Sequence, residues 1–386
     1  MKRAIVNRRT ILLTAAATLM AGCSIIPKTG PTEAPPSPSP VPSPGPSSLP
    51  QDERRHRVAL LVPLSGDTAG AGQSIANATT MAILDTNAEN LRITTYDTAK
   101  GPEAAAREAI ADGNRLILGP LLGSNVASVR QHAAAAGVPI ISFSNDTSIA
   151  GPGVFVMGHV PEQSVGRSVG YARSKGADAF AVLVPESEYG KRAEASFRAA
   201  LREHGGRVVA TERYDRANTS VISAAGRLKS FGGYDAVFIG DGGQSSVRAG
   251  EAVSAGSGNA PQLIGTERWD GELAALRSSE LDGAIFAAVR GDRFPDFVKS
   301  YESRFGGRPY RIATLGYDAV LLTLRASRDW TPGRPFPVNV LFQDGGFDGM
   351  DGIFRFQRNG VVQRAMEVRQ IRNGEARTVS AAPSSF

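Results

Sequence analysis

The stretch VALLVPLSG at residues 58–66 combines an unbroken apolar run with a turn that contains proline, serine and glycine. A short apolar run of this kind is typical of a strand that is buried on both faces of a sheet. Pro63 and Gly66 end the run, and residues 74–85 then carry apolar side chains at helical spacing. A buried strand followed by an amphipathic helix is the unit from which helix-covered parallel sheets are built.

The same unit recurs along most of the chain. This alternation predicts an α/β fold with mostly parallel sheets flanked by helices. About 320 residues are too many for one core, so we expect two lobes. Further strands are expected at 91–96, 115–118, 138–143, 179–184, 207–214, 235–239, 262–265 and 284–289, and helices at 103–111, 124–136, 163–174, 191–204 and 220–231.

The C-terminal segment has a different pattern. Residues 349–356 and 361–371 are strand-like and flank the turn Arg358-Asn359-Gly360, and a second turn sequence follows at Asn373-Gly374. Asn-Gly pairs between apolar runs are typical of β-hairpins. We therefore predict a hairpin here instead of another strand-helix unit, followed by a C-terminal tail at 376–386.

The first 22 residues have the layout of a secretory signal. Basic residues precede an uncharged stretch at 11–21, which is too short to span a bilayer. Cys23 follows directly and is the single cysteine of the 386 residues, so no intramolecular disulfide can form. The stretch resembles a bacterial lipoprotein signal, which implies that Cys23 is lipidated and anchors the protein in a membrane. The pair Arg8-Arg9 leaves both the general and the twin-arginine export routes open.

Residues 23–55 are predicted to form a tether between this anchor and a folded body. Positions 27–50 contain ten prolines with serines between them. Such a composition cannot bury a core and favours extended polyproline conformations. Roughly 24 residues at about 3 Å each would reach up to about 70 Å.

The formal net charge of +6 does not indicate a nucleic-acid partner. Removal of residues 1–22 takes away four basic and no acidic residues, which leaves 39 basic against 37 acidic residues. The basic residues are interspersed with acidic ones, and no basic run carries interleaved aromatic residues. We therefore expect no nucleic-acid binding.

Several short motifs occur along the chain in a fixed order: residues 58–66, Leu118-Gly119-Pro120, residues 137–142, Tyr189-Gly190, Tyr317-Asp318-Ala319 and residues 349–360. Taken together, these motifs resemble the type I periplasmic binding proteins of the leucine-binding kind. The resemblance covers roughly residues 56–374 and implies two lobes that are joined by three crossings and close on a ligand. It places lobe 1 at about 56–157 and 284–346, and lobe 2 at about 158–283 and 347–375.

Two branches of that family are candidates for this chain. One contains receptors that deliver amino acids or related solutes to an ABC importer. The other contains outer-membrane lipoproteins similar to the LppC-type penicillin-binding protein activators, which stimulate peptidoglycan synthases. The lipoprotein signal, the tether and residues 141–146 and 154–158 favour the activator branch, and Ser24 after the cysteine fits sorting to the outer membrane. We expect a lipid-anchored periplasmic activator, with the importer receptor as the alternative.

Five candidate ligand contacts lie at strand ends of the first lobe. In open α/β sheets, ligands bind at the carboxyl ends of strands, where hydroxyl and backbone N–H groups can hold a carboxylate. Glycine and serine also occur there as turn formers and helix caps, which is the alternative explanation. The five residues are Ser65, Gly66, Gly119, Ser142 and Ser144.

Three candidates come from the second lobe. Tyr189 is expected to cover a ligand, and Asp241 or Glu267 to pair with an ammonium group, because a buried charge needs a partner. The acidic ligand residue of the family falls slightly later than Asp241, where this chain has Gln244 and Ser245. That departure weakens the interpretation as an amino-acid receptor, and Asp241 is equally suited to a solvated turn.

The residue types do not indicate an enzyme. The four histidines His56, His132, His159 and His204 lack partners at metal-ligand spacing, so we expect no metal and no cofactor. No Gly-x-Ser-x-Gly or Ser-x-x-Lys motif is present, and Gly70-Ala71-Gly72 lacks the third glycine of a dinucleotide site. A hydrolase that uses two carboxylates is the one enzymatic alternative left open.

Overall fold

The computed structural model describes residues 54–216, 219–254 and 260–386. The chain divides into the units Met1–Ser47 and Ser48–Phe386, and the fold below belongs to the second unit. The expected signal, Cys23 and nearly all of the tether lie outside the described residues. In the described part, no helix has the length and apolar character needed to cross a bilayer.

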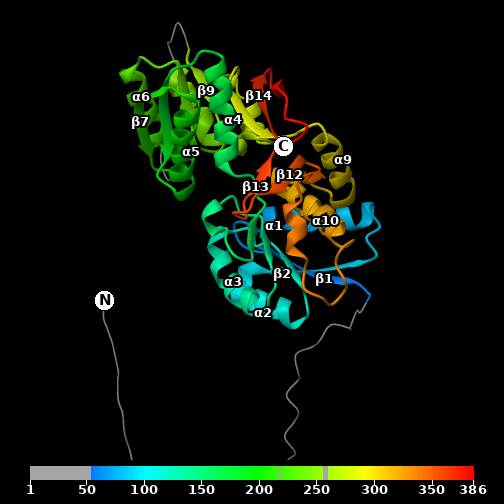
Figure 1. Cartoon of the computed structure of the whole chain (residues 1–386). Helices are drawn as coiled ribbons and strands as arrows, with labels where there is room; N and C mark the ends of the chain where they lie inside the picture. Colours follow the sequence, from blue (N-terminus) through cyan, green and yellow to red (C-terminus); the bar gives the residue numbers. More distant parts are fainter. Residues whose placement is uncertain (1–53, 217–218, 255–259) are drawn as a thin grey trace, which may run out of the picture. The chain divides into compact units, whose positions relative to one another are not determined.

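The first lobe is built around a five-stranded parallel sheet (Figure 1). The strand order is β2-β1-β3-β4-β5, so the direction in which strands are added reverses between β1 and β3. Helices α1 (Ala69–Asp85), α2 (Pro102–Ala111) and α3 (Val126–Ala135) connect successive strands. The strands are β1 (His56–Val62), β2 (Leu91–Asp97), β3 (Leu116–Leu118), β4 (Ile140–Ser142) and β5 (Val154–Val156).

The second lobe is built around a seven-stranded sheet with the order β15-β14-β10-β9-β8-β6-β7. Its five parallel strands reverse direction of addition between β6 and β8, and β14 and β15 are antiparallel. The helices are α4 (Pro161–Ser174), α5 (Glu188–His204), α6 (Ser220–Phe231), α7 (Gly243–Ser254) and α8 (Leu273–Leu276). The strands are β6 (Ala179–Pro185), β7 (Arg207–Tyr214), β8 (Ala236–Ile239), β9 (Gln262–Ile264), β10 (Ile285–Val289), β14 (Met366–Arg372) and β15 (Glu375–Ser380).

A third, antiparallel sheet follows helices α9 (Phe294–Phe305) and α10 (Thr314–Ala326). It contains β11 (Phe347–Gly349), β12 (Gly352–Phe356) and β13 (Val362–Arg364). Strands β12 and β13 form the hairpin predicted around residues 358–360. The strand expected at 361–371 is divided at Ala365, because β13 pairs with β12 whereas β14 pairs with β10 of the second lobe.

The end of the chain differs from the expected tail. Residues 376–380 belong to β15, which pairs with β14. The turn between these strands contains Asn373 at φ 53° and Gly374 at φ 83°. Two consecutive residues with positive φ are the requirement of a type I′ turn, which Asn-Gly meets. The Asn-Gly signal thus marks a second hairpin, β14–β15, which forms one edge of the seven-stranded sheet.

The division of the chain between the lobes also differs from the expected boundaries. Strand β10 was expected to open the return to the first lobe at residue 284, but it lies in the seven-stranded sheet. Residues 347–356 were expected in the second lobe, but Phe354 and Phe356 lie in the same apolar core as Leu60. An apolar run shows that a strand is buried but not in which sheet, so the boundary needs the tertiary structure.

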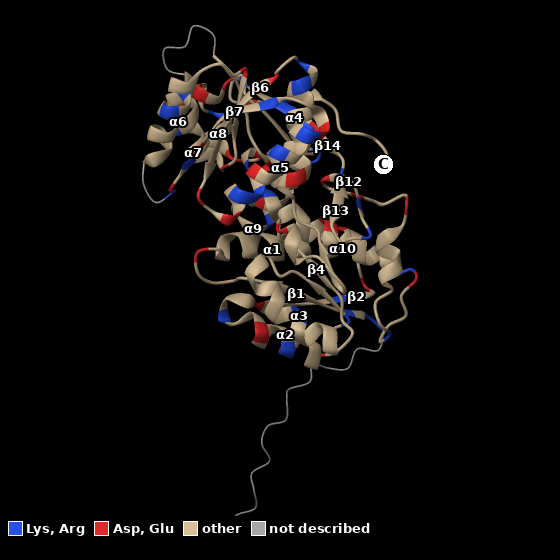
Figure 2. Ribbon diagram, turned by 60° about the vertical axis from the view of Figure 1, so that its left-hand side comes forward, with Lys and Arg blue, Asp and Glu red and all other residues tan. Residues whose placement is uncertain are grey.

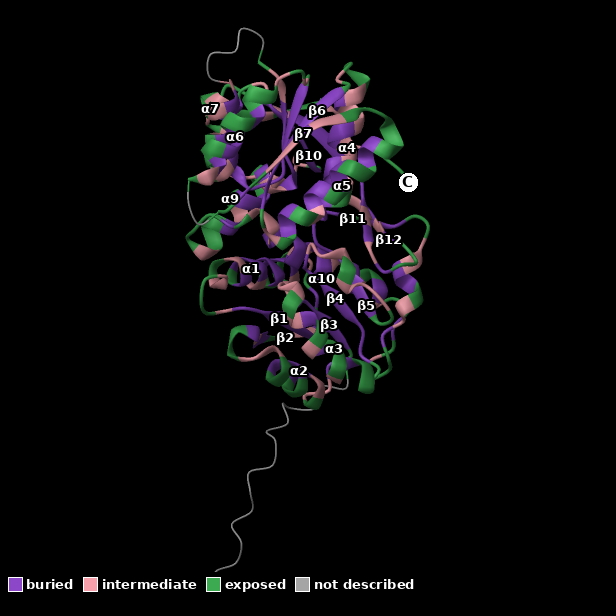
Figure 3. Cartoon of the chain, turned by 90° about the vertical axis from the view of Figure 1, so that its left-hand side faces the viewer, coloured by how far each residue is buried: buried purple, intermediate pink, exposed green. Residues whose placement is uncertain are grey.

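Each lobe is stabilised by an apolar core between its sheet and the helices that cover it. The buried residues lie in the strands and on the inner helix faces, and the outer helix faces are exposed (Figure 3). Basic and acidic residues are interspersed along the helices of both lobes (Figure 2). Three crossings join the lobes, at residues 157–160, at residues 290–293 and at Ala365.

Candidate functional site

The first candidate residues lie where β1 and β3 end, at the reversal point of the first sheet. Ser65 and Gly66 are exposed. Gly119 is buried at φ 96°, and a Cβ atom added there would lie 2.1 Å from the carbonyl oxygen of Leu61. Only glycine permits this approach of the loop after β3 to strand β1, so Gly119 has a structural role.

Ser142 is the last residue of β4, and Ser144 lies in the loop that follows. The Ser142 hydroxyl donates to the carbonyl oxygen of Pro120 at 2.8 Å and accepts from the Ser144 N–H at 3.2 Å. The hydroxyl group is therefore engaged both as a donor and as an acceptor in contacts between the loops. Ser142 is also fully buried. The Ser144 hydroxyl accepts from the Asp146 N–H at 3.1 Å, a bond that does not use its own proton.

Tyr189 begins the corresponding region of the second lobe. It lies in the first turn of α5, where the Ser187 hydroxyl accepts from the Gly190 N–H at 3.1 Å. A Cβ atom on Gly190 would lie 2.0 Å from the carbonyl oxygen of Pro185, so glycine allows α5 to approach the end of β6. The Tyr189 hydroxyl donates to Glu267 Oε1 at 2.7 Å, and burial raises its pKa well above the usual value.

Glu267 lies three residues after the end of β9 and is only 8% exposed. Its second oxygen, Oε2, is buried and has no hydrogen-bond partner among the residues that the structure describes. Burial raises the pKa of Glu267 to about 7, against the hydrogen bond from Tyr189, while the Glu162 charge adds to the rise. One oxygen of the carboxyl group is thus hydrogen-bonded and the other is not, and the pKa of the group lies near neutral pH.

Asp241 differs from Glu267 because its charge is already matched. It accepts from the Tyr214 hydroxyl at 2.6 Å, from Arg216 Nε at 3.0 Å and from the Gly242 N–H at 2.7 Å. A second contact joins it to Arg216 Nη2. Burial opposes ionisation, but these bonds outweigh it and hold the pKa of Asp241 below its usual value. Asp241 was expected as a possible ammonium partner, but its oxygens are engaged within the lobe.

Arg268 connects these groups. Its guanidinium carbon lies 4.7 Å from the centre of the Tyr189 ring, a cation–π distance. Its Nη1 atom lies 3.7 Å from Asp241 Oδ1, which is an ion pair without a short hydrogen bond. The structure therefore brings the three candidates of the second lobe into one cluster, with Arg268 between Tyr189 and Asp241.

Three polar contacts join the first-lobe loop after β4 to helices α4 and α5 of the second lobe. Arg192 of α5 forms a 2.9 Å ion pair with Asp146 and donates to Asn145 Oδ1 at 3.2 Å. Thr147 donates to Glu162 of α4 at 2.9 Å. Ser144 lies two residues before Asp146, and Tyr189 three residues before Arg192. The carboxyl-end loops of both sheets thus meet at this place.

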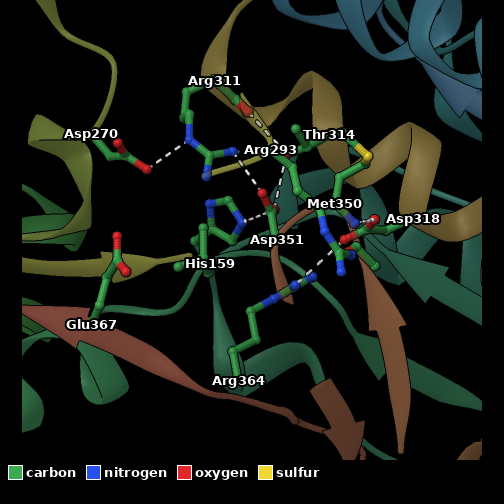
Figure 4. A network of polar contacts seen from close by, with 12 residues as sticks. His159, Asp270, Arg293, Arg311, Thr314, Asp318, Met350, Asp351, Arg364 and Glu367 are labelled. Carbon is green, nitrogen blue, oxygen red and sulfur yellow. Dashed lines mark hydrogen bonds and ion pairs between the residues drawn. The ribbon is translucent and has the colours of Figure 1, made fainter. Parts of the chain in front are cut away.

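A buried network at the crossings was not predicted from the sequence (Figure 4). Arg311 donates to Asp270 Oδ2 at 2.6 Å and to Asp351 Oδ1 at 2.7 Å. His159 Nε2 lies 2.8 Å from Asp351 Oδ2, and Arg369 Nη1 donates to Asp270 Oδ1 at 2.6 Å. Burial opposes the charges of Asp270 and Asp351, but the Arg311 guanidinium outweighs it and lowers the pKa of both.

Each crossing contains or borders one residue of this region. His159 comes from the first crossing, Arg293 from the second and Arg364 borders the third (Figure 4). Arg293 Nη1 donates to the carbonyl oxygen of Gly349 at 2.6 Å, and Arg364 Nη1 lies 3.8 Å from Asp318 Oδ2. Burial, followed by repulsion from the Asp351 charge, raises the pKa of Asp318 to about 7.

A cavity of about 380 Å³ lies at the end of β6, between residues of β6, α5 and β7. None of the eight candidate residues lines it. In the described ranges, no group of three or more histidine, cysteine or carboxylate side chains is arranged to hold a metal ion. The lining residues are Val184, Pro185, Glu186, Lys191, Glu194 and Arg213.

Several solved structures with the same fold carry the names of ABC transporter or solute binding proteins. A putative branched-chain amino acid ABC transporter from Rhodospirillum rubrum matches with a TM-score of 0.73 at 20% identity, over 84% of this chain and all of that chain. LivJ from Streptococcus pneumoniae in complex with isoleucine matches with a TM-score of 0.67 at 18% identity, over 85% of this chain and all of that chain. A solute binding protein from R. palustris in complex with benzoate matches with a TM-score of 0.66 at 16% identity, over 86% of this chain and 98% of that chain. At these identities the likeness shows the fold.

One curated relative is an uncharacterized protein of Rickettsia prowazekii, which is 25% identical over 167 residues. That match covers 43% of this chain and 45% of the relative, so the chain spans less than half of the relative's length. The family model described as "Periplasmic binding protein" matches residues 56–376, which is most of the chain and includes both lobes and all three crossings. The chain therefore belongs to the periplasmic binding protein family.

Proposed function

We propose that this protein is the receptor of an ABC importer and binds a small organic solute between its two lobes in the periplasm. The observation that carries the proposal is the meeting of the two sets of strand-end loops, through Arg192 and Asp146 at 2.9 Å. Reversal points of open α/β sheets are the usual ligand sites of this architecture. Here the contact joins the loop after β4 of the first lobe to α5, which follows β6 at the reversal point of the second sheet.

The contacts between the lobes suit a protein that opens and closes. The pair Arg192–Asp146 is about one quarter exposed on each side, and Thr147–Glu162 is exposed, so water can replace both when the lobes separate. The Asp270–Arg311 pair near the crossings is buried, with both side chains 8% exposed. We propose that the buried pair holds the hinge and that the exposed pairs break when a solute enters. A ligand that touches both lobes then shifts the population toward the closed form.

The importer role replaces the activator role as our preferred interpretation. The structures with this fold that are reported above are named as transporters or solute binding proteins, and none is named as an activator of peptidoglycan synthesis. The proposed partner is accordingly an ABC permease, and the proposed action is binding without catalysis.

The lipid anchor on Cys23 and the tether at 27–50 remain part of the proposal, supported by the sequence. A permease partner favours an anchor in the inner membrane, whereas Ser24 favours the outer membrane. Labelling with a radioactive fatty acid, in the wild type and in Cys23→Ala, tests the anchor, and separation of the two membranes shows its location.

Thermal unfolding of the purified protein in the presence of amino acids, benzoate and hydroxybenzoates tests the proposal. A solute present at 100 times its Kd stabilises the folded state by about 2.7 kcal/mol, so one class of compound should raise the Tm by several degrees. Ser144→Ala should reduce the rise, and Ser303→Ala, at an exposed serine of α9, should not. If no compound shifts a cooperative transition, the receptor role is wrong, and capture of a peptidoglycan synthase by the purified protein becomes the next measurement.

A further inference from the structure

Among the described residues, the buried network at the crossings contains more carboxyl groups than guanidinium groups (Figure 4). Each of these side chains is at most 10% exposed. If every carboxyl group were ionised, four negative charges would face three positive ones. An unbalanced buried charge is costly, so one proton is expected among these groups. The carboxyl groups are those of Asp270, Asp318, Asp351 and Glu367, and the guanidinium groups are those of Arg311, Arg364 and Arg369.

Three of the carboxyl groups accept a hydrogen bond from a guanidinium group. Arg311 donates to Asp270 at 2.6 Å and to Asp351 at 2.7 Å. Arg369 donates to Glu367 at 2.6 Å. A charged donor favours the ionised form of the carboxyl group that it binds, so these three groups do not hold the proton.

Asp318 is the fourth carboxyl group, and its contacts are different. Its Oδ1 atom accepts from the Met350 N–H at 2.6 Å, and its Oδ2 atom is buried without a hydrogen-bond partner among the described residues. Burial raises the pKa of Asp318 to about 7, and repulsion from Asp351 adds to the rise. His159 is the other group able to hold the proton, but burial lowers its pKa. The contacts therefore favour Asp318 as the holder of the proton.

Arg364 faces Asp318 without binding it. Its Nη1 atom lies 3.8 Å from Asp318 Oδ2, which is too long for a hydrogen bond. Both atoms are buried and lack a hydrogen-bond partner in the described part of the chain. A carboxylate would draw the guanidinium group into a direct bond, because an unpaired buried charge is costly. The gap therefore indicates a neutral Asp318 in this conformation.

The other terminal nitrogen of Arg364 is bound to a crossing between the lobes. Nη2 donates to the carbonyl oxygen of Met157 at 2.9 Å, at the start of the first crossing. Asp318, in contrast, belongs to α10 of the first lobe. The guanidinium group thus lies between a partner on a segment that joins the lobes and a partner that is fixed within one lobe.

We propose that Asp318 and Arg364 form a proton-dependent switch at the hinge. In the closed conformation, in which Arg192 and Asp146 pair, Asp318 is neutral and Arg364 is bound to Met157. In the open conformation, the bond to Met157 is released and Arg364 forms a direct ion pair with the ionised Asp318. Release of the proton therefore favours opening, and protonation favours closure.

The charged groups nearest to Asp318 keep their charge near neutral pH. Burial opposes the charge of Asp351, but Arg311 outweighs it and lowers the pKa of Asp351. The hydrogen bond to Asp348 raises the pKa of Arg293, and arginine stays charged throughout this range. The charged groups on the elements around α10 are Asp85 of α1, Arg293 at the second crossing, Arg311 directly before α10, Asp348 of β11, Asp351 directly before β12 and Arg364 of β13.

The proposed ion pair determines the size of the effect. In the open conformation it should return the pKa of Asp318 to its usual value of about 4, whereas that pKa is about 7 in the closed conformation. A rise in pH favours the conformation in which the group has the lower pKa. The ratio of open to closed protein should therefore rise roughly 10-fold between pH 6 and pH 8.

Distance measurements between two spin labels on the full chain test this ratio. The labels are attached at Arg107→Cys of α2 in the first lobe and Glu203→Cys of α5 in the second, both exposed, in a Cys23→Ala background. Two distance populations are expected, and Arg192→Ala, which removes the contact of the closed form, identifies the open one. Because no solute is added, the result does not depend on the proposed receptor role. Equal ratios at pH 6 and pH 8 would overturn the proposal.

The variant Asp318→Asn keeps the shape of the side chain and cannot ionise. It should hold the ratio at the value of the wild type at pH 6 over the whole range. Asp296→Asn, at an exposed position of α9, should keep the wild-type pH dependence. Glu267→Gln, which removes the other carboxyl group with a pKa of about 7, should keep it as well. If the dependence persists in Asp318→Asn or is lost in Glu267→Gln, the switch at Asp318 is wrong.

Infrared spectroscopy of the wild-type protein detects the proton itself and remains decisive if Asp318→Asn does not fold. A protonated carboxyl group has a C=O stretching band that a carboxylate lacks. Labelling of aspartate with heavy carbon shifts the bands of aspartate but not those of glutamate, which separates Asp318 from Glu267. We expect a band of protonated aspartate at pH 6 that is lost by pH 8. Absence of this band at pH 6 would show that Asp318 holds no proton and would refute the switch.

Discussion

Arg311 Nε donates a 2.6 Å hydrogen bond to Asp270 Oδ2, and this bond joins the element before α10 in the first lobe to the loop after β9 in the second. Arg369 of β14 binds the other oxygen of the same carboxylate at 2.6 Å. One buried carboxylate therefore holds two guanidinium groups, one from each lobe. The contact combines charge pairing with bonds to both oxygens, which is the arrangement that makes a buried ion pair tolerable.

The first prediction concerns this shared carboxylate. Asp270→Asn leaves Arg311 and Arg369 without their common counter-charge in a buried place, which should reduce the free energy of unfolding by about 3 kcal/mol. Urea denaturation followed by circular dichroism measures the change. The control is Asp282→Asn, whose partner Arg372 is exposed at 3.4 Å and whose loss should cost less than about 1 kcal/mol. Equal effects of the two substitutions would contradict a role for the buried pair.

The second prediction concerns pH. Because the folded-state pKa of Glu267 is raised to about 7, the folded state holds a proton that the unfolded chain has lost above about pH 4.5. This stabilisation is present at pH 4.5 and is lost as the pH rises through 7, up to about 3 kcal/mol for a fully buried group. The Tm of the unliganded protein should fall from pH 5 to pH 8, and Glu267→Gln should flatten that dependence. An unchanged slope in the variant would show that Glu267 does not titrate in this range.

The third prediction separates two neighbouring serines. Ser142→Ala removes the donor to the carbonyl oxygen of Pro120 in a fully buried place and should destabilise the fold by about 1–3 kcal/mol. Ser144→Ala should instead weaken binding of the solute found in the thermal panel by roughly 3- to 10-fold, with a smaller effect on stability. Denaturant unfolding and calorimetry on both variants compare the two effects. The opposite assignment of effects would mean that Ser142 contacts the ligand.

The fourth prediction uses two helical glycines as a matched pair. Gly190→Ala places a Cβ atom 2.0 Å from the carbonyl oxygen of Pro185, so α5 must move away from β6 and stability should fall by about 2 kcal/mol or more. Gly226→Ala in α6 meets open space and should raise stability by about 0.5–1 kcal/mol. Thermal unfolding of both variants measures the difference. Since Gly190 follows Tyr189, its substitution should also weaken solute binding.

The strand and helix pattern of the lobes was largely predictable because apolar periodicity records burial. Strand β7 and helix α6 match the predicted ranges 207–214 and 220–231. Helix α7 was not predicted, because its sequence GQSSVRAGEAVS has few large apolar residues and buries glycine, serine and alanine instead. Small buried residues produce a weak periodic signal, although they permit close packing.

The candidate site was predictable only in part. Tyr189, Asp241 and Glu267 could be selected as candidate ligand contacts because each follows a predicted strand. The structure brings these three residues into one cluster. Their different states depend on Arg216 and Tyr214, which a sequence pattern does not pair with Asp241. The network at the crossings left no local signal, since His159 and Asp351 are 192 positions apart and meet only in the folded chain.

The division of the last long strand at Ala365 has a mechanical consequence. Arg364 is paired with Phe354 in one sheet and Met366 with Val289 in another, so a single residue separates two rigid ladders. Ala365 is itself buried, and its N–H donates to the carbonyl oxygen of Ile353 at 3.1 Å. A connection this short has almost no slack, so the lobes cannot slide apart along it. Relative motion of the lobes at this crossing must therefore occur by rotation about a few backbone dihedral angles at Ala365. Such rotation lets the lobes turn relative to each other, but does not let them move apart.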